Sequence, residues 1–286
     1  MRHMGDVLAG IHATWEFESD AVVIRFERGI RTPKLFQALR ERRIPHEALA
    51  SVTLAPGKRG TVVLHAVPRP GADPLMEAAA GQLKEGCDPY RLVLPAERET
   101  LAEYYRDELR AMLTPEDGPS DGFLVTAPEG PQSFKAYDGK ASFDGSSEVS
   151  FRWSWSGASS EKWKAGDQTF PVRELSGVEW RSPDVFDGYL RLLPRSGEPR
   201  PAQADNDPAA VVFGLGYGPV HQSLPFAAAV LAAVRGAGRA AALPEAELRD
   251  SAAVAERIRH LGELHRAGLV TDQEFSAKKA ELLAEL

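Results

Sequence analysis

Three closely spaced glycines near residue 215 have the composition of a phosphate-binding loop. Gly214, Gly216 and Gly218 follow a stretch with strand character and precede a helical stretch, which is where a glycine-rich turn commonly binds phosphate. The run lacks a glycine at the third position of the dinucleotide fingerprint, and it lacks the lysine and serine of a P-loop. We therefore expect a flexible turn here and no cofactor.

The histidines and the single cysteine do not have the spacing of a catalytic or metal site. His46 precedes Glu47, but no second histidine completes a metalloprotease motif. His260 and His265 are five residues apart, so they diverge around a helix. Cys87 has no histidine or second cysteine near it in the sequence, as is typical of a small buried side chain. We expect no catalytic residue and no metal ligand, although a site built from distant residues would leave no such signal.

Basic residues are concentrated in the first third of the chain. The cluster consists of Arg25, Arg28, Arg31, Lys34, Arg42 and Arg43, joined by Lys58 and Arg59. A group of four to eight basic residues can bind an anionic membrane surface. The alternative is that residues 40–43 form a solvated turn and that the formal net charge of −7 opposes approach to such a surface.

Tryptophans are concentrated in the second part of the chain. Trp153 and Trp155 alternate with polar residues, as in a strand with one buried face, so we expect both in the core. Trp163 stands between Lys162 and Lys164, and we expect it in a serine-rich loop. It is either a core residue or an exposed anchor for a partner.

Length and composition predict two modest domains and a tail. The chain has 286 residues, of which 43% are hydrophobic and 26% charged, and these are ordinary values for a globular protein. Its negative net charge argues against a nucleic-acid partner. The most apolar stretch, residues 227–243, is interrupted by Arg235 and Arg239, so we do not expect a membrane span. With one cysteine and no apolar leader, we expect a cytoplasmic protein, with the inner face of the membrane as the alternative.

Two successive parts of the chain resemble each other in the order of their segments. The matched pairs are residues 22–26 with 149–153, 44–52 with 170–178, 60–67 with 188–194, and 88–94 with 207–213. Each part ends in a helical stretch with apolar residues three or four positions apart. These are Leu101, Tyr105, Leu109 and Met112 in the first part, and Leu224, Ala228, Leu231 and Val234 in the second. The pattern predicts a duplicated domain.

Each copy is expected to contain short strands and one closing helix. Ser19–Asp20 and Asp144–Gly145 have the composition of hairpin turns. The first copy has an additional helical segment, with Asp73 as its N-cap and Pro74 as its first residue. The expected boundaries are 1–115 for the first domain, 116–121 for a linker, 122–236 for the second domain, 237–251 for a second linker, and 252–286 for the tail.

The tail has the pattern of a helical hairpin. An apolar stripe runs along its first helix, Gly268 ends that helix, and residues 271–274 form a capping box for the next one. Two helices of this length bury little surface alone, so they need another copy of the chain or a different protein. We expect the contact residues to be Ile258, Leu261, Leu264, Leu269, Phe275 and Leu282.

These segments resemble two known bacterial modules. Residues 257–275 and 278–283 resemble the SHOCT module, a short C-terminal helical hairpin that is thought to support oligomerisation. The two copies are similar to pleckstrin-homology (PH)-like domains through the elements that begin with Ile44–Pro45 and Phe170–Pro171. The whole chain is similar to a family from high-GC bacteria with tandem PH-like domains and a SHOCT tail. This resemblance implies an α+β fold, in which each copy is an antiparallel β-sandwich or barrel closed by a C-terminal helix, and an α-helical hairpin follows.

Together these observations favour a non-enzymatic scaffold or adaptor. Such a protein would self-associate or dock a protein partner through the tandem domains and the hairpin. The alternative is a peripheral membrane protein that binds anionic lipid through the basic cluster of the first copy.

Overall fold

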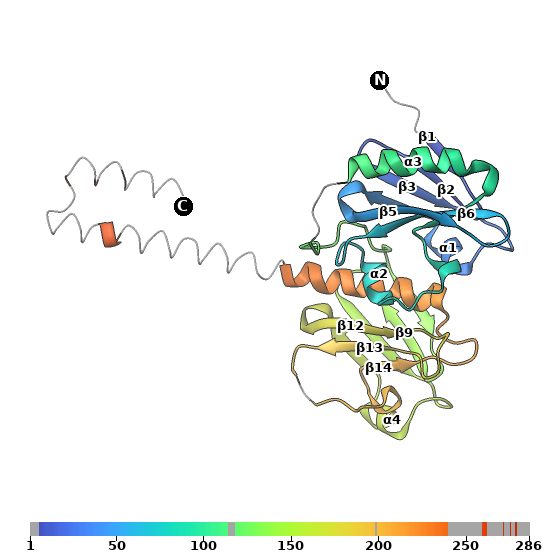
Figure 1. Ribbon diagram of the computed structural model, residues 1–286. Coiled ribbons are helices and arrows are strands. Elements are labelled where there is room, and N and C mark those ends of the chain that lie inside the picture. The colour runs from blue at the N-terminus through green and yellow to red at the C-terminus, as the bar shows by residue number, and fades with distance from the viewer. Residues whose placement is uncertain are drawn as a thin grey trace. The chain divides into compact units, whose positions relative to one another are not determined.

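The computed structural model (Figure 1) describes residues 6–113, 118–197, 199–239, 259–261, 271, 275 and 278. The chain divides into two compact units, residues 1–235 and 236–286. Both copies of the repeat belong to the first unit. In the second unit, the described residues 259–261, 275 and 278 are helical.

The first copy has two antiparallel sheets. A four-stranded sheet contains, in order, β1 (Asp6–Ala9), β2 (Ala13–Phe17), β3 (Ala21–Phe26) and β4 (Glu41–Pro45). A three-stranded sheet contains β5 (Leu49–Pro56), β6 (Thr61–Pro68) and β7 (Arg91–Pro95). The helices are α1 (Lys34–Leu39) between β3 and β4, α2 (Pro74–Ala79) between β6 and β7, and α3 (Glu99–Met112) at the end. Short 3-10 turns lie at His46–Ala48, Glu85–Cys87 and Ala96–Arg98.

The second copy repeats this order. Its four-stranded sheet contains β8 (Gln132–Lys135), β9 (Gly139–Phe143), β10 (Glu148–Trp153) and β11 (Gln168–Pro171). Its three-stranded sheet contains β12 (Leu175–Arg181), β13 (Tyr189–Pro194) and β14 (Ala210–Val212). The other elements are α4 (Ser160–Ala165), 3-10 turns at Val172–Glu174 and Ala204–Asn206, and a helix over residues 220–239. The predicted duplication and the mixed α+β fold are confirmed. The described strands of each copy form two separate sheets and no closed barrel.

Three details of the sequence interpretation are wrong. Trp155 is 85% exposed, because β10 ends at Trp153 and the chain then turns, so the alternation stops. The buried face of α3 contains Ala102, Tyr105 and Leu109, while Leu101 and Met112 are exposed. The serine-rich stretch is not all loop, since Ser159 caps α4, and Trp163 lies on that helix.

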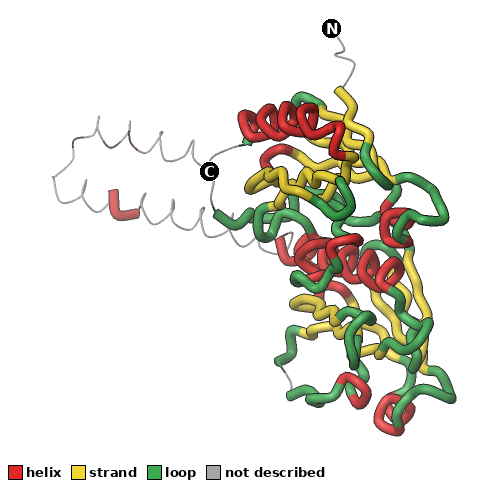
Figure 2. Tube along the Cα trace, turned by 45° about the vertical axis from the view of Figure 1, so that its right-hand side comes forward, coloured by secondary structure: helices red, strands yellow, loops and turns green. Residues whose placement is uncertain are grey.

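The helix over residues 220–239 is buried on nearly every side along its first half. Residues 223–231 are all buried, and the four apolar residues predicted to line one face are among the buried ones. The helix lies between the strands of the two copies in both views (Figures 1 and 2), and its Arg235 donates to the backbone oxygen of Gly71 and pairs with Glu77. A helix covered on all sides is expected to be apolar all round. This position accounts for the most apolar stretch of the sequence, and no helix in the described part of the chain is long and apolar enough to cross a membrane.

The segment between the copies is attached to the first copy. From Gly118 onward, part of the predicted linker 116–121 is described, and the oxygen of Gly118 accepts a hydrogen bond from Arg69. The backbone N–H of Val125 donates to the oxygen of Ala72, and its side chain joins the core of the first copy. These contacts extend the first copy beyond residue 115, so the segment that links the two copies without contacting the first is shorter than predicted.

A buried carboxylate joins three elements of the first copy. Asp73, which is 1% exposed, accepts two hydrogen bonds from Arg42 on β4, at 2.7 and 3.0 Å. It also accepts from the hydroxyl of Tyr90, just before β7, and from the backbone N–H of Leu75 in α2. Each carboxylate oxygen of Asp73 thereby accepts two hydrogen bonds, which replace the bonds to water that burial removes. A buried charge is compatible with a stable fold under this condition. The predicted N-cap role of Asp73 is confirmed.

We expect Asp73→Ala to lower the free energy of unfolding by about 3–5 kcal/mol, because it leaves the guanidinium of Arg42 buried without a partner. The matched control is Arg43→Ala on the same strand, since Arg43 pairs with Glu18 and Asp20 at the surface. That exposed pair should be worth less than about 1 kcal/mol. Urea denaturation followed by circular dichroism measures both values, and equal small losses would contradict this account of Asp73.

Candidate functional site

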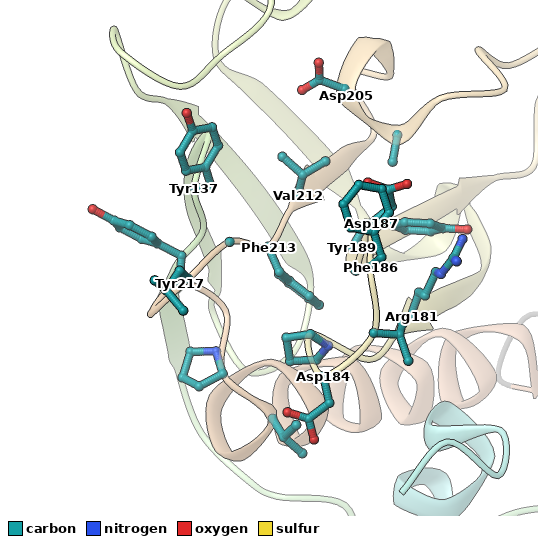
Figure 3. Close-up of a pocket in the computed structure, with 18 of the residues that line it drawn as sticks. Tyr137, Arg181, Asp184, Phe186, Asp187, Tyr189, Asp205, Val212, Phe213 and Tyr217 are labelled. Carbon is teal, nitrogen blue, oxygen red and sulfur yellow. The ribbon is translucent and has the colours of Figure 1, made fainter.

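A hollow of about 900 Å³ opens in the second copy (Figure 3). Its walls come from Arg181 and residues 183–189, at the β12–β13 connection, from residues 202–205, and from residues 212–217, 219 and 220, which lead into the helix over residues 220–239. Tyr137, on the β8–β9 turn, completes the lining. Loops carried by two sheets and a helix are thus gathered at one place, as is common for binding sites.

Large apolar side chains at this hollow point into solvent. Phe186 is 86% exposed and Leu215 102% exposed, and Val185, Tyr137 and Tyr217 are also exposed. The rings of Tyr137 and Tyr217 meet edge to face, with centroids 6.2 Å apart. Single exposed apolar residues are common on protein surfaces, but a group of them around a concave surface marks an interaction site.

The glycine run forms the turn that presents Leu215. The N–H of Gly214 donates to the oxygen of Tyr217, and the N–H of Tyr217 donates back to Gly214. Gly218 has a φ of +63°, and a Cβ there would lie 2.1 Å from the ring of Phe213. Its N–H donates to the oxygen of Lys135. Because these backbone amides are already bonded to carbonyl oxygens, they cannot cradle a phosphate, and the expected turn is what the structure contains.

The β12–β13 loop is held in place by the first copy. The side-chain amide of Gln82, which follows α2, donates to the oxygen of Trp180 and accepts from the N–H of Ser182, at 3.0 and 2.9 Å. Lys84 pairs with Asp184 at 3.0 Å. The helical segment present in the first copy alone therefore positions one wall of the hollow in the second.

Carboxylates outnumber cations at the hollow. Asp184, Asp187 and Asp205 line it, and Arg181 is the one basic residue among the lining residues. In the view of Figure 3, Asp205 and Asp184 lie on opposite sides of Phe213. The hydroxyl of Tyr189 donates to Glu179, and burial together with this bond raises the pKa of that hydroxyl. The hollow therefore combines an apolar surface with an excess of negative charge.

The comparisons with known proteins identify the repeat. A family model described as "Domain of unknown function (DUF4429)" matches residues 15–110 and 141–231, which coincide with the two copies and make up more than half of the chain. The chain belongs to the DUF4429 family. A second model, the short C-terminal domain (SHOCT), matches residues 256–283, which confirms the predicted SHOCT tail. No curated protein matches the chain.

Arg42 of the first DUF4429 copy is not part of a basic surface. It is 7% exposed and bound to Asp73, because the alternation of β4 turns residues 42 and 44 inward. Arg25 and Arg43 lie at the surface, but Arg25 pairs with Glu16 and Glu41, and Arg43 pairs with Glu18 and Asp20. These carboxylates offset the charge on which the prediction depended.

The other predicted basic residues are exposed on two connections. Arg28 and Arg31 lie between β3 and α1, where they flank Ile30, and Lys34 is the first residue of α1. Lys58 and Arg59 lie on the β5–β6 turn. Within the described part of the chain, none of these five side chains forms an ion pair.

The remaining predicted positions are placed as follows. Trp163 is 55% exposed, whereas its neighbour Lys162 is fully buried and pairs with Asp138 at 2.5 Å. Of the predicted tail contacts, Leu261 and Phe275 are half-buried. The tail contacts that lie outside the described residues are Ile258, Leu264, Leu269 and Leu282.

Sequence reasoning missed the hollow of the DUF4429 chain. A signal for it existed in the apolar residues that interrupt turn-forming stretches. Val185 and Phe186 stand between Pro183–Asp184 and Asp187–Gly188, and Leu215 and Tyr217 stand within the glycine run. Such residues have no period, so they give no strand or helix pattern. Among the described residues, no group of three His, Cys, Asp or Glu side chains could hold a metal.

We expect Gln82→Ala to loosen the β12–β13 loop, because it removes both hydrogen bonds that the first copy makes to its backbone. Hydrogen exchange should become faster at residues 182–188. The control is Gln37→Ala, since Gln37 bonds the oxygens of Gly29 and Thr32 in the first copy. Unchanged protection of residues 182–188 in the Gln82 variant would show that the first copy does not hold this wall.

Proposed function

We propose that this protein is a non-enzymatic adaptor, which docks a protein partner at the hollow of its second copy and self-associates or docks through its SHOCT tail. The observation that carries the proposal is the exposure of Phe186 and Leu215 beside a concave surface. Covering such side chains removes apolar area from water, and aromatic anchors of this kind dominate the affinity of many interfaces.

The PH-like nature of the two copies is part of the proposal. It is supported by the repeated order of four strands, three strands and a closing helix. PH-like folds host lipid-binding, peptide-binding and self-association surfaces. The fold is therefore compatible with an adaptor, and the choice among these surfaces rests on the side chains.

The side chains at the hollow favour binding over catalysis. Its lining contains tyrosines, aspartates and one arginine, but no serine, threonine, cysteine, histidine or lysine. A nucleophile paired with a general base therefore does not occur among these lining residues. The aspartates are exposed, so they lack the burial that tunes a carboxyl for proton transfer at neutral pH.

The tail supplies the second contact in this proposal. We expect Leu264→Glu to reduce the mass of any oligomer of the full chain, because a charge in an apolar helical contact lacks a partner. Size-exclusion chromatography with light scattering measures the mass. Arg266→Glu, outside the predicted apolar stripe, is the control. An oligomer of the same mass in the Leu264 variant would remove self-association through this stripe from the proposal.

A second candidate function is binding to anionic lipid at the inner face of the membrane. It is favoured by Ile30, which is 107% exposed at the tip of a loop between Arg28 and Arg31. An apolar tip flanked by cations suits a membrane surface, where the side chain enters the headgroup region and each cation adds about 1 kcal/mol.

Vesicles of phosphatidylcholine with phosphatidylserine test this candidate. Arg28→Glu with Arg31→Glu should abolish binding by the full chain, and binding by the unaltered chain should weaken as salt is added. The control is Arg173→Glu with Arg195→Glu in the second copy, which changes the net charge equally. Binding that both double variants reduce to the same degree would reflect net charge alone and would reject the loop as a lipid site.

A further inference from the structure

We infer that the hollow of the second copy binds a peptide segment with an apolar side chain next to arginine or lysine. This inference rests on the proposed function and adds the chemistry of the segment. Four observations carry it: the openness of the site, the excess of carboxylates, the tyrosine faces at its rim, and the bonded state of three backbone N–H groups in the glycine turn.

The shape of the site favours a peptide over a small molecule. Small-molecule sites enclose most of the ligand surface. Here Phe186 and Leu215 project away from the protein, at 86% and 102% exposure. Only a partner that lies across both loops would cover these side chains while also entering the hollow. A segment of polypeptide has the length to do this.

The charges select a cationic segment. Asp187 and Asp205 are exposed, and neither forms an ion pair with another described residue. Asp184 pairs with Lys84, which leaves Arg181 to face two carboxylates. Two carboxylates against one arginine leave an excess of one negative charge among the lining residues, so arginine or lysine in a partner would be attracted and an acidic segment would be repelled.

The rim also offers ring faces to a cation. Tyr137 and Tyr217 are both exposed and meet edge to face, so at least part of each ring is open to solvent. A guanidinium or ammonium over such a ring gains about 0.5–1 kcal/mol at an exposed site. Aromatic rings and carboxylates together thus prefer cations that stand beside apolar groups.

The backbone of the site does not recognise anions. The N–H groups of Gly214, Tyr217 and Gly218 all donate to carbonyl oxygens of the protein. Phosphate or carboxylate groups would therefore find three N–H groups of the glycine turn already bonded and would face the aspartates. The turn therefore serves to hold the side chain of Leu215 in solvent, and it does not serve as an anion-binding loop.

Selection from a random-peptide library on the full chain tests the inference. We expect enriched peptides to combine arginine or lysine with aromatic or large aliphatic residues. A fluorescein-labelled copy of the most enriched peptide then reports affinity by fluorescence anisotropy. Phe186→Ala and Leu215→Ser should each weaken binding about tenfold, and Asp187→Asn with Asp205→Asn should weaken it severalfold and reduce its dependence on salt.

The controls lie outside the hollow. Trp163→Ala removes an exposed aromatic side chain of α4, and Glu103→Gln with Glu108→Gln removes two exposed carboxylates from α3. Neither should change the affinity. All the altered side chains are exposed, so the circular dichroism and the melting temperature should stay the same.

The outcomes separate this inference from the function on which it rests. Enriched peptides that are neutral or acidic, and that depend on Phe186 and Leu215 but not on the aspartates, would overturn the cationic chemistry and leave the docking function intact. A library without enrichment, or peptides whose affinity is the same in the Phe186 and Leu215 variants, would overturn both.

Discussion

The fold of the first copy depends on the buried carboxylate of Asp73. Three segments that are distant in sequence meet there, because β4 supplies Arg42, the residue before β7 supplies the hydroxyl of Tyr90, and α2 supplies the backbone N–H of Leu75. An ion pair that is cut off from water stabilises a fold only when its remaining donors and acceptors are bonded. Asp73 meets this condition, so its bonds fix the position of α2 relative to β4 and β7. The position of α2 in turn determines the positions of the residues that contact it.

The second copy depends on this placement. Gln82 and Lys84 follow α2 and bind the β12–β13 loop, while Arg235 of the last helix pairs with Glu77 on α2. Between β13 and β14, the described residues of the second copy contain no counterpart of α2, and their 3-10 turn, Ala204–Asn206, matches the turn Glu85–Cys87 of the first copy. Duplication has therefore produced two unequal halves: one carries the supporting helix, and the other carries the hollow that this helix stabilises.

Much of the fold could be predicted, because it depends on local patterns. The two hairpin turns and the capping of α2 by Asp73 are visible within a few residues of sequence, and the repeat and the SHOCT tail are visible in the order of such short segments. The site could not be predicted, because distance in sequence hides its parts: Tyr137, Phe186 and Leu215 come from three loops. The burial of two basic residues could not be predicted for the same reason. Arginine and lysine are usually exposed, so Arg42 and Lys162 look like surface residues in the sequence. Their burial is explained only by the carboxylates of Asp73 and Asp138, each of which is distant in sequence from the cation that it binds.

The glycine run shows that one sequence motif can form either a phosphate-binding loop or a turn that holds an apolar side chain in solvent. In a phosphate-binding loop, glycines leave backbone N–H groups free to face the ligand. Here Gly218 makes room for the ring of Phe213, Gly214 packs against Tyr137, and the N–H groups of Gly214, Tyr217 and Gly218 donate to carbonyl oxygens of the protein itself. Both loops of the hollow are thus fixed before any partner arrives, one by its own turn and the other by Gln82. Loops that are already ordered lose little conformational entropy on binding, so apolar side chains held out on such loops retain most of the free energy that their burial against a partner provides.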